Sequence, residues 1–469
     1  MTTFNIPESW LELNIGDIAD VIAGGTPKAA ELDNFAKSGT AHAWLTPADL
    51  SKYNKKYISY GKRDLSQKGL DTSSAKLMPK GAILFSSRAP IGYVVVANNE
   101  ISTNQGFKSF VFTKHVDSSF AYYYLRSIRD VAESRGSGTT FKELSGANAK
   151  KLPFILAPLA EQIQIANKTD ELLAQVDAIK TRLDAIPNIL KRFRQSVLAA
   201  AVSGKLTFAW NQNNSKVKWD RDIIKNISSK IGSGSTPKGG KSAYRESGVM
   251  LVRSMNIHFD KIKYKGMAFI DEAQAKKLDN AKVHEDDVLL NITGASIGRV
   301  NIAPTELNGA RVNQHVAIIR CNKNYILPKY FRYQLSSPAT QKWILDENYG
   351  ATRQALTKGM IEEYKINLPS IDEQIEIVRK IDQYFTFADQ IEQRVKDAQT
   401  RVNNLTQSIL AKAFRGELTA EWREQNKDLI GGENSAEALL DKIKAERESI
   451  QITKPKKKKK KNSTKKKCE

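Results

Sequence analysis

A glycine-rich stretch is the first candidate for chemistry in this sequence. Gly234-Ser-Thr-Pro-Lys-Gly-Gly-Lys-Ser242 is similar to loops that cradle phosphates with backbone amides, but five residues separate its outer glycines where that motif needs four. A related stretch that begins at Gly25 reads Gly-Thr-Pro-Lys-Ala-Ala and has no Gly-Lys pair. We therefore expect no nucleotide or other cofactor to bind at either stretch.

The sequence has no pattern for metal or acid–base catalysis. The five histidines are His42, His115, His258, His284 and His315. None pairs with another at i, i+4 and none has a cysteine nearby, so we expect no metal site. Adjacent carboxylates such as Asp286 and Asp287 are more typical of a solvated surface than of an acid and a base, and the same holds for Glu362 and Glu363.

Methyl transfer is a further reaction that the sequence can be tested for. Methylation of an adenine amino group needs an Asn/Asp-Pro-Pro-aromatic loop that holds the flipped base, and the sequence contains no Pro-Pro. With no catalytic constellation left, we predict that the chain is not an enzyme.

An internal repeat is the strongest signal in the sequence. EQIQIANKTDELLAQVDAIKTRL, from Glu161, matches EQIEIVRKIDQYFTFADQIEQRV, from Glu373, at an offset of 212 residues. The same offset aligns QSVLAAAVSGKLTFAW with QSILAKAFRGELTAEW without a gap. Landmarks upstream keep their order and include Trp10 with Trp219, Ile91-Gly92 with Ile297-Gly298, and Asn104 with Asn313. The chain therefore holds two copies of one unit, each with a variable part and a preserved helical part.

Both preserved parts carry a heptad seam. In the first copy the seam residues are Leu172, Val176, Ile179, Leu183, Ile186, Leu190, Phe193 and Val197. In the second copy they are Ile377, Ile381, Tyr384, Ala388, Ile391, Val395, Ala398, Val402, Leu405 and Ile409. Alternating steps of four and three place such residues on one side of a helix that pairs with a partner. The alternative is a core stripe inside one domain. Pro187, which stands where the second copy has Gln399, predicts a kink or short break near Ala185.

Short apolar runs such as GAILFSS and HVAIIRC, punctuated by Gly, Pro and Asn, predict strands and a few helices in the variable parts. We therefore predict an α+β fold with two tandem α/β domains, separated by two long helices that pair with each other as a coiled coil. The expected boundaries are 1–157 and 211–368 for the domains, 158–210 and 369–425 for the helical spacers, 426–453 for a C-terminal helix and 454–469 for a disordered lysine-rich tail.

Net charge indicates the kind of binding partner, and cysteine content indicates the cellular compartment. The formal net charge is +22, and the ten lysines and one glutamate of residues 454–469 account for +9, so the rest of the chain still carries +13. Such an excess favours a polyanionic partner. The two cysteines, Cys321 and Cys468, are too few for a disulfide framework, and the chain shows neither a membrane span nor a signal peptide. We predict a cytoplasmic protein.

The residues of the repeat resemble a known family. IPESW near the start, the PLAEQ and PSIDEQ segments that open the long helices, and above all QSILAKAFRGELTAEWR are similar to specificity subunits of type I restriction-modification systems. The resemblance spans residues 5–450. It implies two target recognition domains that bind double-stranded DNA and are held apart by the two long helices, which form an antiparallel coiled coil with pseudo-twofold symmetry. It further implies assembly with two methyltransferase subunits and two ATP-dependent restriction subunits. The unmatched Pro187 and the polylysine tail depart from the shared pattern.

Comparison of the copies sorts candidate DNA contacts. Residues kept in both copies cannot by themselves make two domains read different sequences, so we expect framework or phosphate contacts from Thr26, Thr236, Lys28, Lys238, Gln105, Gln314, Thr140 and Thr352. For Gly92, Gly298, Asn104 and Asn313 a turn is the favoured interpretation.

Base readers should be polar side chains where the copies differ, because Arg pairs naturally with guanine and Gln or Asn with adenine. Thr46 stands opposite Arg253, Arg88 opposite Gly294, Lys108 near Val316, and Phe141-Lys142 opposite Arg353-Gln354. Thr293, beside Gly294, is a further candidate. The alternative for each is an ordinary exposed loop residue.

These expectations combine into a function. The chain would bind two short half-sites separated by an unspecified spacer, whose length the helices set, and would direct methyltransferase and restriction subunits to them. A methyltransferase partner would then flip an adenine in each half-site. Two other classes remain open, namely a modification enzyme in its own right and a coiled-coil scaffold without a role on DNA.

Overall fold

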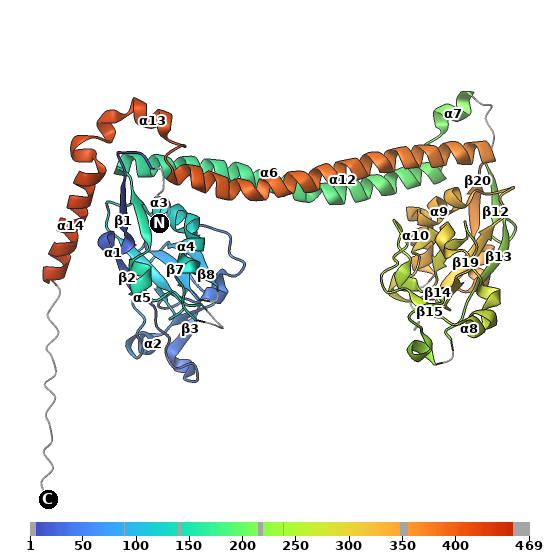
Figure 1. The fold of residues 1–469 in the computed structure, drawn as a ribbon, viewed down its shortest axis with the longest axis horizontal. Coiled ribbons are helices and arrows are strands. Elements are labelled where there is room, and N and C mark those ends of the chain that lie inside the picture. Colours follow the sequence, from blue (N-terminus) through green and yellow to red (C-terminus); the bar gives the residue numbers. More distant parts are fainter. Residues whose placement is uncertain are drawn as a thin grey trace, which may run out of the picture. The chain divides into compact units, whose positions relative to one another are not determined.

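The computed structural model describes residues 6–88, 90–138, 142–213, 219–237, 239–347 and 355–453. They divide into two compact units, Met1–Thr181 with Gln399–Glu469, and Arg182–Ala398. Two long helices, α6 (Leu159–Val202) and α12 (Ile371–Phe414), each contribute residues to both units (Figure 1).

The first unit contains a mixed sheet with the strand order β2-β10-β7-β8-β5. The strands of this unit are β1 (Leu11–Asn14), β2 (Ala19–Ala23), β3 (Phe35–Lys37), β4 (Trp44–Leu45), β5 (Tyr57–Ile58), β6 (Arg63–Leu65), β7 (Ile83–Ser87), β8 (Ile91–Ala97), β9 (Ser102–Thr103), β10 (Lys108–Phe112) and β11 (Pro153–Leu156). Its shorter helices are α1 (Ile15–Ile18), α2 (Gln67–Asp71), α3 (Ser118–Ser127), α4 (Arg129–Ser134) and α5 (Gly146–Lys150). Strand β1 pairs antiparallel with β11, and β4 pairs parallel with β9.

The second unit repeats this topology. Its strands are β12 (Asp220–Ile223), β13 (Ser228–Ser233), β14 (Val249–Val252), β15 (Ala268–Ile270), β16 (Val288–Asn291), β17 (Val300–Ile302), β18 (Arg311–Val312), β19 (Val316–Cys321) and β20 (Lys365–Leu368). Its shorter helices are α7 (Phe208–Asn213), α8 (Glu272–Lys277), α9 (Pro328–Ser336), α10 (Pro338–Asp346) and α11 (Lys358–Glu363). The order β13-β19-β16-β17 matches β2-β10-β7-β8, β12 pairs with β20 as β1 does with β11, and β14 is parallel to β18 as β4 is to β9.

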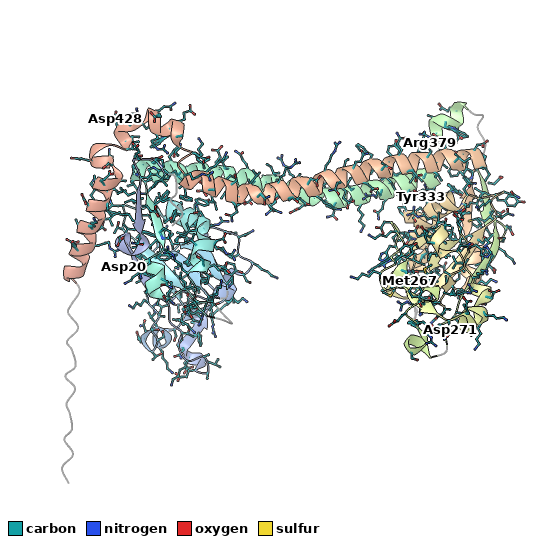
Figure 2. The ribbon with its side chains drawn as sticks, in the orientation of Figure 1. Asp20, Met267, Asp271, Tyr333, Arg379 and Asp428 are labelled. Atoms are coloured by element: carbon teal, nitrogen blue, oxygen red, sulfur yellow. The ribbon has the colours of Figure 1, made fainter. Side chains whose placement is uncertain are left out.

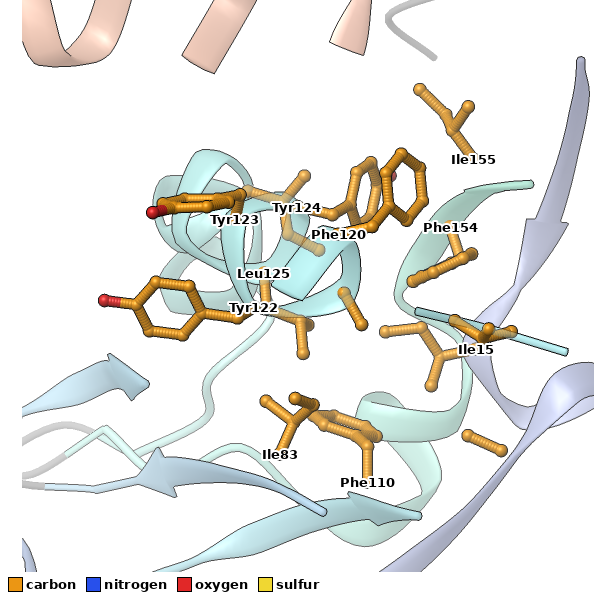
Figure 3. Close-up of a cluster of buried hydrophobic side chains, with 14 of the residues drawn as sticks. Ile15, Ile83, Phe110, Phe120, Tyr122, Tyr123, Tyr124, Leu125, Phe154 and Ile155 are labelled. Atoms are coloured by element: carbon orange, nitrogen blue, oxygen red, sulfur yellow. The ribbon is translucent and has the colours of Figure 1, made fainter. Parts of the chain in front are cut away.

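An aromatic core joins the first sheet to the helices that cover it. Asp117 caps α3 by accepting a hydrogen bond from the Phe120 amide, which starts a helix whose Phe120 and Tyr124 are fully buried. Figure 3 shows these side chains above Ile83 and Phe110 of the sheet. Full burial of a large apolar side chain stabilises a fold by about 1.5–3 kcal/mol, so the cluster fixes α3 on the sheet.

The two long helices pack in opposite directions in each unit. In the first unit, Ile165 near the start of α6 shares the core with Leu410 and Phe414 near the end of α12, and Phe414 packs edge-on against Phe120 at 5.4 Å between ring centroids. In the second unit the roles are exchanged. Late residues of α6, Val197 and Leu198, share a core with early residues of α12, Ile377 and Ile381.

Of the 18 residues of the predicted heptad seam, eight are buried, seven are partly buried and three are exposed. Val176, Leu190 and Val197 of α6 are at most 7% exposed, as are Ile377, Ile381, Ala388, Val395 and Val402 of α12. Ile179, Tyr384 and Leu405 are exposed instead. The expected break at Pro187 does not occur, because α6 is helical without interruption from Leu159 to Val202. Proline removes one backbone hydrogen bond. The other backbone hydrogen bonds of the 44-residue helix and its packed seam hold the helix together at this position.

In each unit a buried carboxylate at the start of one long helix accepts hydrogen bonds from the segment that follows the other long helix. In the first unit Glu161, at the start of α6, accepts hydrogen bonds from Trp10 Nε1 at 2.8 Å, Thr419 Oγ1 at 2.7 Å and Arg423 Nε at 2.9 Å. Glu161 is fully buried. The segment that follows the second long helix is thus bound to the beginning of the first.

The second unit contains the reciprocal arrangement. Glu373, at the start of α12, accepts from Trp219 Nε1 at 2.8 Å, Thr207 Oγ1 at 2.6 Å and Asn211 Nδ2 at 2.7 Å. The segment that follows each long helix therefore caps the start of the other one. The match between SGKLT and RGELT in the repeat has this physical cause.

A second pair of carboxylates fastens a domain helix to a long helix in each unit. Tyr123 of α3 donates to Asp170 of α6, and Tyr333 of α9 donates to Asp382 of α12 at 2.6 Å (Figure 2). Burial raises the pKa of both tyrosines, so each hydroxyl keeps its proton and donates. Both copies therefore contain the same bond between a domain-helix tyrosine and a long-helix aspartate.

The C-terminal segment packs on the first unit. After α13 (Ala420–Gln425), α14 (Ala436–Thr453) buries Ala436, Leu439 and Ile443, and Arg447 pairs with Asp20 at 3.2 Å (Figure 2). This helix lies within residues 426–453, for which the sequence predicted a C-terminal helix. The lysine-rich tail, residues 454–469, lies outside the described residues.

Candidate nucleic-acid interface

Four chain segments meet where strands of the first unit end, and we call them the loop edge: Gly24–Thr26 after β2, Thr46 after β4, Arg88 after β7 and Asn104–Gln105 after β9. Backbone hydrogen bonds join neighbouring segments. The Gly25 amide donates to Thr103 O at 2.8 Å, Asn104 N to Leu45 O at 2.9 Å and Ser87 N to Gly106 O at 2.7 Å. Sequence comparison named one candidate in each segment, and the fold brings them together.

The second unit has the same loop edge, formed by Gly234–Thr236 after β13, Arg253 after β14, Thr293 after β16 and Asn313–Gln314 after β18. The amide of Gly234 donates to Asn313 O at 3.3 Å, Asn313 N to Val252 O at 3.2 Å and Ile292 N to His315 O at 3.0 Å. The second and third of these bonds are equivalent in the two copies. The first differs, because Gly234 and Asn313 correspond to Gly24 and Asn104 rather than to Gly25 and Thr103.

A threonine–glutamine pair crosses both loop edges. Thr26 Oγ1 donates to Gln105 Oε1, and Thr236 Oγ1 donates to Gln314 Oε1. All four residues are exposed. Because the pair is retained in both copies, it suits a contact that positions DNA without specifying sequence, such as a phosphate contact from the glutamine amide.

Glycine is required where the loops cross. A Cβ built on Gly24 would lie 1.9 Å from the carbonyl oxygen of Asn104, and one on Gly234 would lie 1.7 Å from that of Val312. No side chain fits at either place. The glycine-rich stretch at residue 234 therefore has a structural explanation, namely this close approach of two backbones.

Of the four residues interpreted as turns, Asn104 and Asn313 directly precede turns and Gly298 lies in one, whereas Gly92 lies in strand β8. Asn104 Oδ1 accepts from the Gly106 amide at 2.9 Å, and Asn313 Oδ1 accepts from the His315 amide at 3.1 Å. Gly92 and Gly298 have φ values of +96° and +84°, a region that favours glycine.

A group of three charged side chains lies at the first loop edge: Arg88 belongs to the edge, and Lys108 and Glu143 lie beside it. Glu143 is 3.8 Å from Arg88 and 3.4 Å from Lys108, measured between carboxylate oxygens and the nearest nitrogens. Arg88 and Glu143 are about two-fifths exposed, whereas Lys108 is 12% exposed. We call these residues the charged triad.

The second loop edge has a neutral chain at the same place. Gln314 Nε2 lies 3.2 Å from His315 Nε2, and His315 Nδ1 is hydrogen-bonded to Thr293 Oγ1. One set of proton positions satisfies the chain, with the imidazole proton on Nδ1 and donated to Thr293. A cavity of about 390 Å³ opens beside it, lined by Met255, Thr293, Arg299 and His315 among others.

Thr46 and Arg253 occupy equivalent positions, as the sequence comparison predicted. Each precedes a short 3₁₀ turn, and each backbone amide donates to a side chain three residues on: Thr46 N to Asp49 Oδ2 at 2.8 Å and Arg253 N to Asn256 Oδ1 at 3.0 Å. The Arg253 guanidinium donates to the Gly266 carbonyl and stacks 5.2 Å from the ring centroid of Tyr244.

The remaining candidates divide into two groups. Lys28 and Lys142 are exposed, and Lys28 pairs with Glu31 at 3.5 Å. The following candidates lie outside the described residues: Lys238, Thr140, Phe141, Thr352, Arg353 and Gln354.

The structure changes one pairing of the copies. Leu144 N donates to Ser87 O and Leu356 N to Ile292 O, so Ser87 corresponds to Ile292. Arg88 is therefore equivalent to Thr293 rather than to Gly294. Sequence comparison missed this because short insertions between the landmarks shift the alignment by one residue.

The same register reveals two polar residues that sequence comparison did not single out. His315 stands at the position of Gly106, because the carbonyl of each accepts from the amide at the end of the equivalent strand, and Glu143 stands at the position of Ala355. No signal in the sequence marked either one, since their significance comes from the partners that the loops bring to them.

Neither a metal centre nor a membrane segment is found among the described residues. They contain no group of three or more His, Cys, Asp and Glu side chains that could hold a metal ion. No helix in that part of the chain is long and apolar enough to cross a membrane.

Fold and site define a class of protein: a duplicated mixed α/β domain, each copy closed by the same pair of long helices and each presenting one loop edge. Residues 7–188 and 217–399 match the family described as the type I restriction modification DNA specificity domain. The chain belongs to this family.

Relatives along nearly the whole chain support the assignment. The specificity subunit of the type I restriction enzyme EcoBI from Escherichia coli is 35% identical over 94% of this chain and 93% of its own length. That of EcoKI from Escherichia coli K12 is 32% identical over 95% and 97%. A crystal structure of the HsdS subunit from Thermoanaerobacter tengcongensis has the same fold, with a TM-score of 0.61 at 17% identity, covering 89% of this chain and 99% of that one.

Proposed function

We propose that this chain is the DNA sequence-recognition subunit of a type I restriction-modification complex, and that its two domains read the two half-sites of a bipartite target. The observation that carries the proposal is the loop edge, which occurs twice with two equivalent backbone bonds and the same Thr–Gln pair but with different polar side chains around it. Equal backbones position two stretches of DNA alike, and unequal side chains read different bases.

The chain supplies recognition in this scheme, and catalysis belongs to its partners. We propose assembly in the cytoplasm with two methyltransferase subunits, which flip and methylate an adenine in each half-site, and with two ATP-dependent restriction subunits in the full complex. The half-sites would be separated by a spacer of fixed length without base preference. The basic body of the chain favours the approach to DNA.

Selection from a randomised DNA duplex tests the proposal. The full-length chain is incubated with the library near physiological salt, with excess non-specific DNA to absorb binding by the lysine-rich tail, and the retained duplexes are sequenced. We expect two short conserved blocks at fixed spacing. Retention without any consensus would identify a non-specific scaffold and overturn the proposal.

Methylation provides the second measurement. The chain alone, given a methyl donor, should leave its target unmethylated, and the methylated adenines of the host genome should fall within the selected blocks. Methyl transfer by the isolated chain would instead identify a modification enzyme.

A further inference from the structure

The first loop edge differs from the second by charge, at positions that the backbone makes equivalent. Arg88 and Glu143 form a backbone bridge, as Thr293 and Ala355 do in the second unit. The first unit thus has an ionic pair where the second has a hydroxyl and a methyl group.

The third member of the charged triad, Lys108, also has an uncharged residue at the equivalent position of the second unit. Lys108 pairs with Ala23 in the register of β10 on β2, and Ala317 pairs with Ser233 in that of β19 on β13. Since Ala23 and Ser233 both lie three residues before the conserved threonine, Lys108 is equivalent to Ala317. All three charges of the triad are therefore confined to the first unit.

The donors and acceptors of the triad match those of one kind of base pair. Arg and Lys donate to the O6 and N7 atoms of guanine, while Glu accepts from the N4 amino group of cytosine. Glu143 is about two-fifths exposed, so its carboxylate is accessible although it also contacts both cations. A G·C pair presents the acceptors and the donor side by side in the major groove.

We propose that Glu143 is a specificity-determining residue, and that the Arg88–Glu143–Lys108 triad selects a G·C base pair in the half-site read by the first unit. This inference rests on the proposed function. The other explanation of the contacts is that Glu143 only neutralises and orients the two cations, which then bind phosphates.

The variant Glu143→Gln separates these explanations. The amide keeps the shape of the side chain but loses the charge and one acceptor oxygen, and the backbone bonds of Glu143 to Ser137 remain. In the duplex selection we expect preference for one G·C pair of one half-site to fall about tenfold, equivalent to about 1.4 kcal/mol, with the other half-site unchanged. The affected half-site should differ from the one affected by Arg253→Ala.

Two further variants complete the experiment. Glu133→Gln, an exposed carboxylate outside the loop edge, is the matched control and should leave both half-sites unchanged. Glu143→Asp keeps the charge on a shorter side chain and should weaken binding while keeping the preference for the G·C pair. If Glu143→Gln does not fold, Glu143→Asp is the variant on which the inference is tested.

The outcomes distinguish the inference from the function on which it rests. If the wild-type chain selects no consensus, the proposed function fails. If the wild type selects two half-sites but Glu143→Gln tightens or weakens binding equally on all sequences, Glu143 acts only on phosphate-binding cations and the inference is overturned. A change at an A·T pair overturns it as well.

Discussion

Replacing Thr419 by valine should destabilise the first unit although Thr419 lies 258 residues from its partner Glu161. Valine has the shape of threonine without the hydroxyl, so the change leaves no cavity. It removes the 2.7 Å hydrogen bond to Glu161 Oε1, while the bonds from Trp10 and Arg423 remain.

The expected loss follows from the burial of both partners. Thr419 and Glu161 are fully buried, so water cannot replace the missing donor. A hydrogen bond to a charged group contributes about 1.5–3 kcal/mol, which gives an expected loss of about 2 kcal/mol for the first unit. That corresponds to roughly 30-fold faster exchange through unfolding of the unit.

Hydrogen exchange followed by mass spectrometry measures this, because peptides from the two units are scored separately. Amides of β1 and β11 should lose protection in Thr419→Val, while those of β12 and β20 should not. In Thr207→Val the amides of β12 and β20 should lose protection and those of β1 and β11 should not, since Thr207 donates to Glu373 at 2.6 Å. Serine at either position restores the hydroxyl and is the control.

Unchanged protection of β1 and β11 in Thr419→Val would refute the reasoning that the segment after the second long helix closes the first unit. Equal loss in both units would refute it too, because the reciprocal bonds would then not be local.

Four other predictions follow from the site and the fold. Arg253→Ala should lower base discrimination in one half-site by about 1–3 kcal/mol in binding selection, and unchanged binding to cognate and mutated half-sites would contradict its role. Gly234→Ala should weaken binding and lower the melting temperature because its Cβ would meet Val312 O at 1.7 Å, whereas Gly232→Ala, with open space around it, should not. Burial raises the pKa of Cys321 to about 12, so iodoacetamide should label Cys321 at neutral pH only after denaturation. Peptide mapping separates Cys321 from Cys468, and fast labelling of Cys321 in the native chain would show an exposed thiol. Deleting one heptad from each long helix removes about 10 Å of helix and should shorten the selected spacer by about three base pairs; an unchanged spacer would exclude the helices as its determinant.

The repeat and the seam were readable in the sequence because they depend on spacing along one chain. Heptads at Val176 and Ile377 require only that helical residues three and four apart share a face. The kept Thr26 and Gln105 pointed to one site for a similar reason, since duplication preserved both members. The effect of Pro187 was not readable, because its cost competes with the buried contacts of a long helix.

The sequence by itself determined the duplication, the two long helices, the mixed α/β class of the domains and most positions of the loop edge. Only the tertiary structure decided that Arg88 corresponds to Thr293, that Glu143 joins Arg88 and Lys108, and that Thr419 and Thr207 each cap the other copy's helix. The physical reason is that these contacts join residues from different segments, 35 to 258 positions apart. Local propensity and periodicity carry no information about partners at such separations, and the folded backbone does.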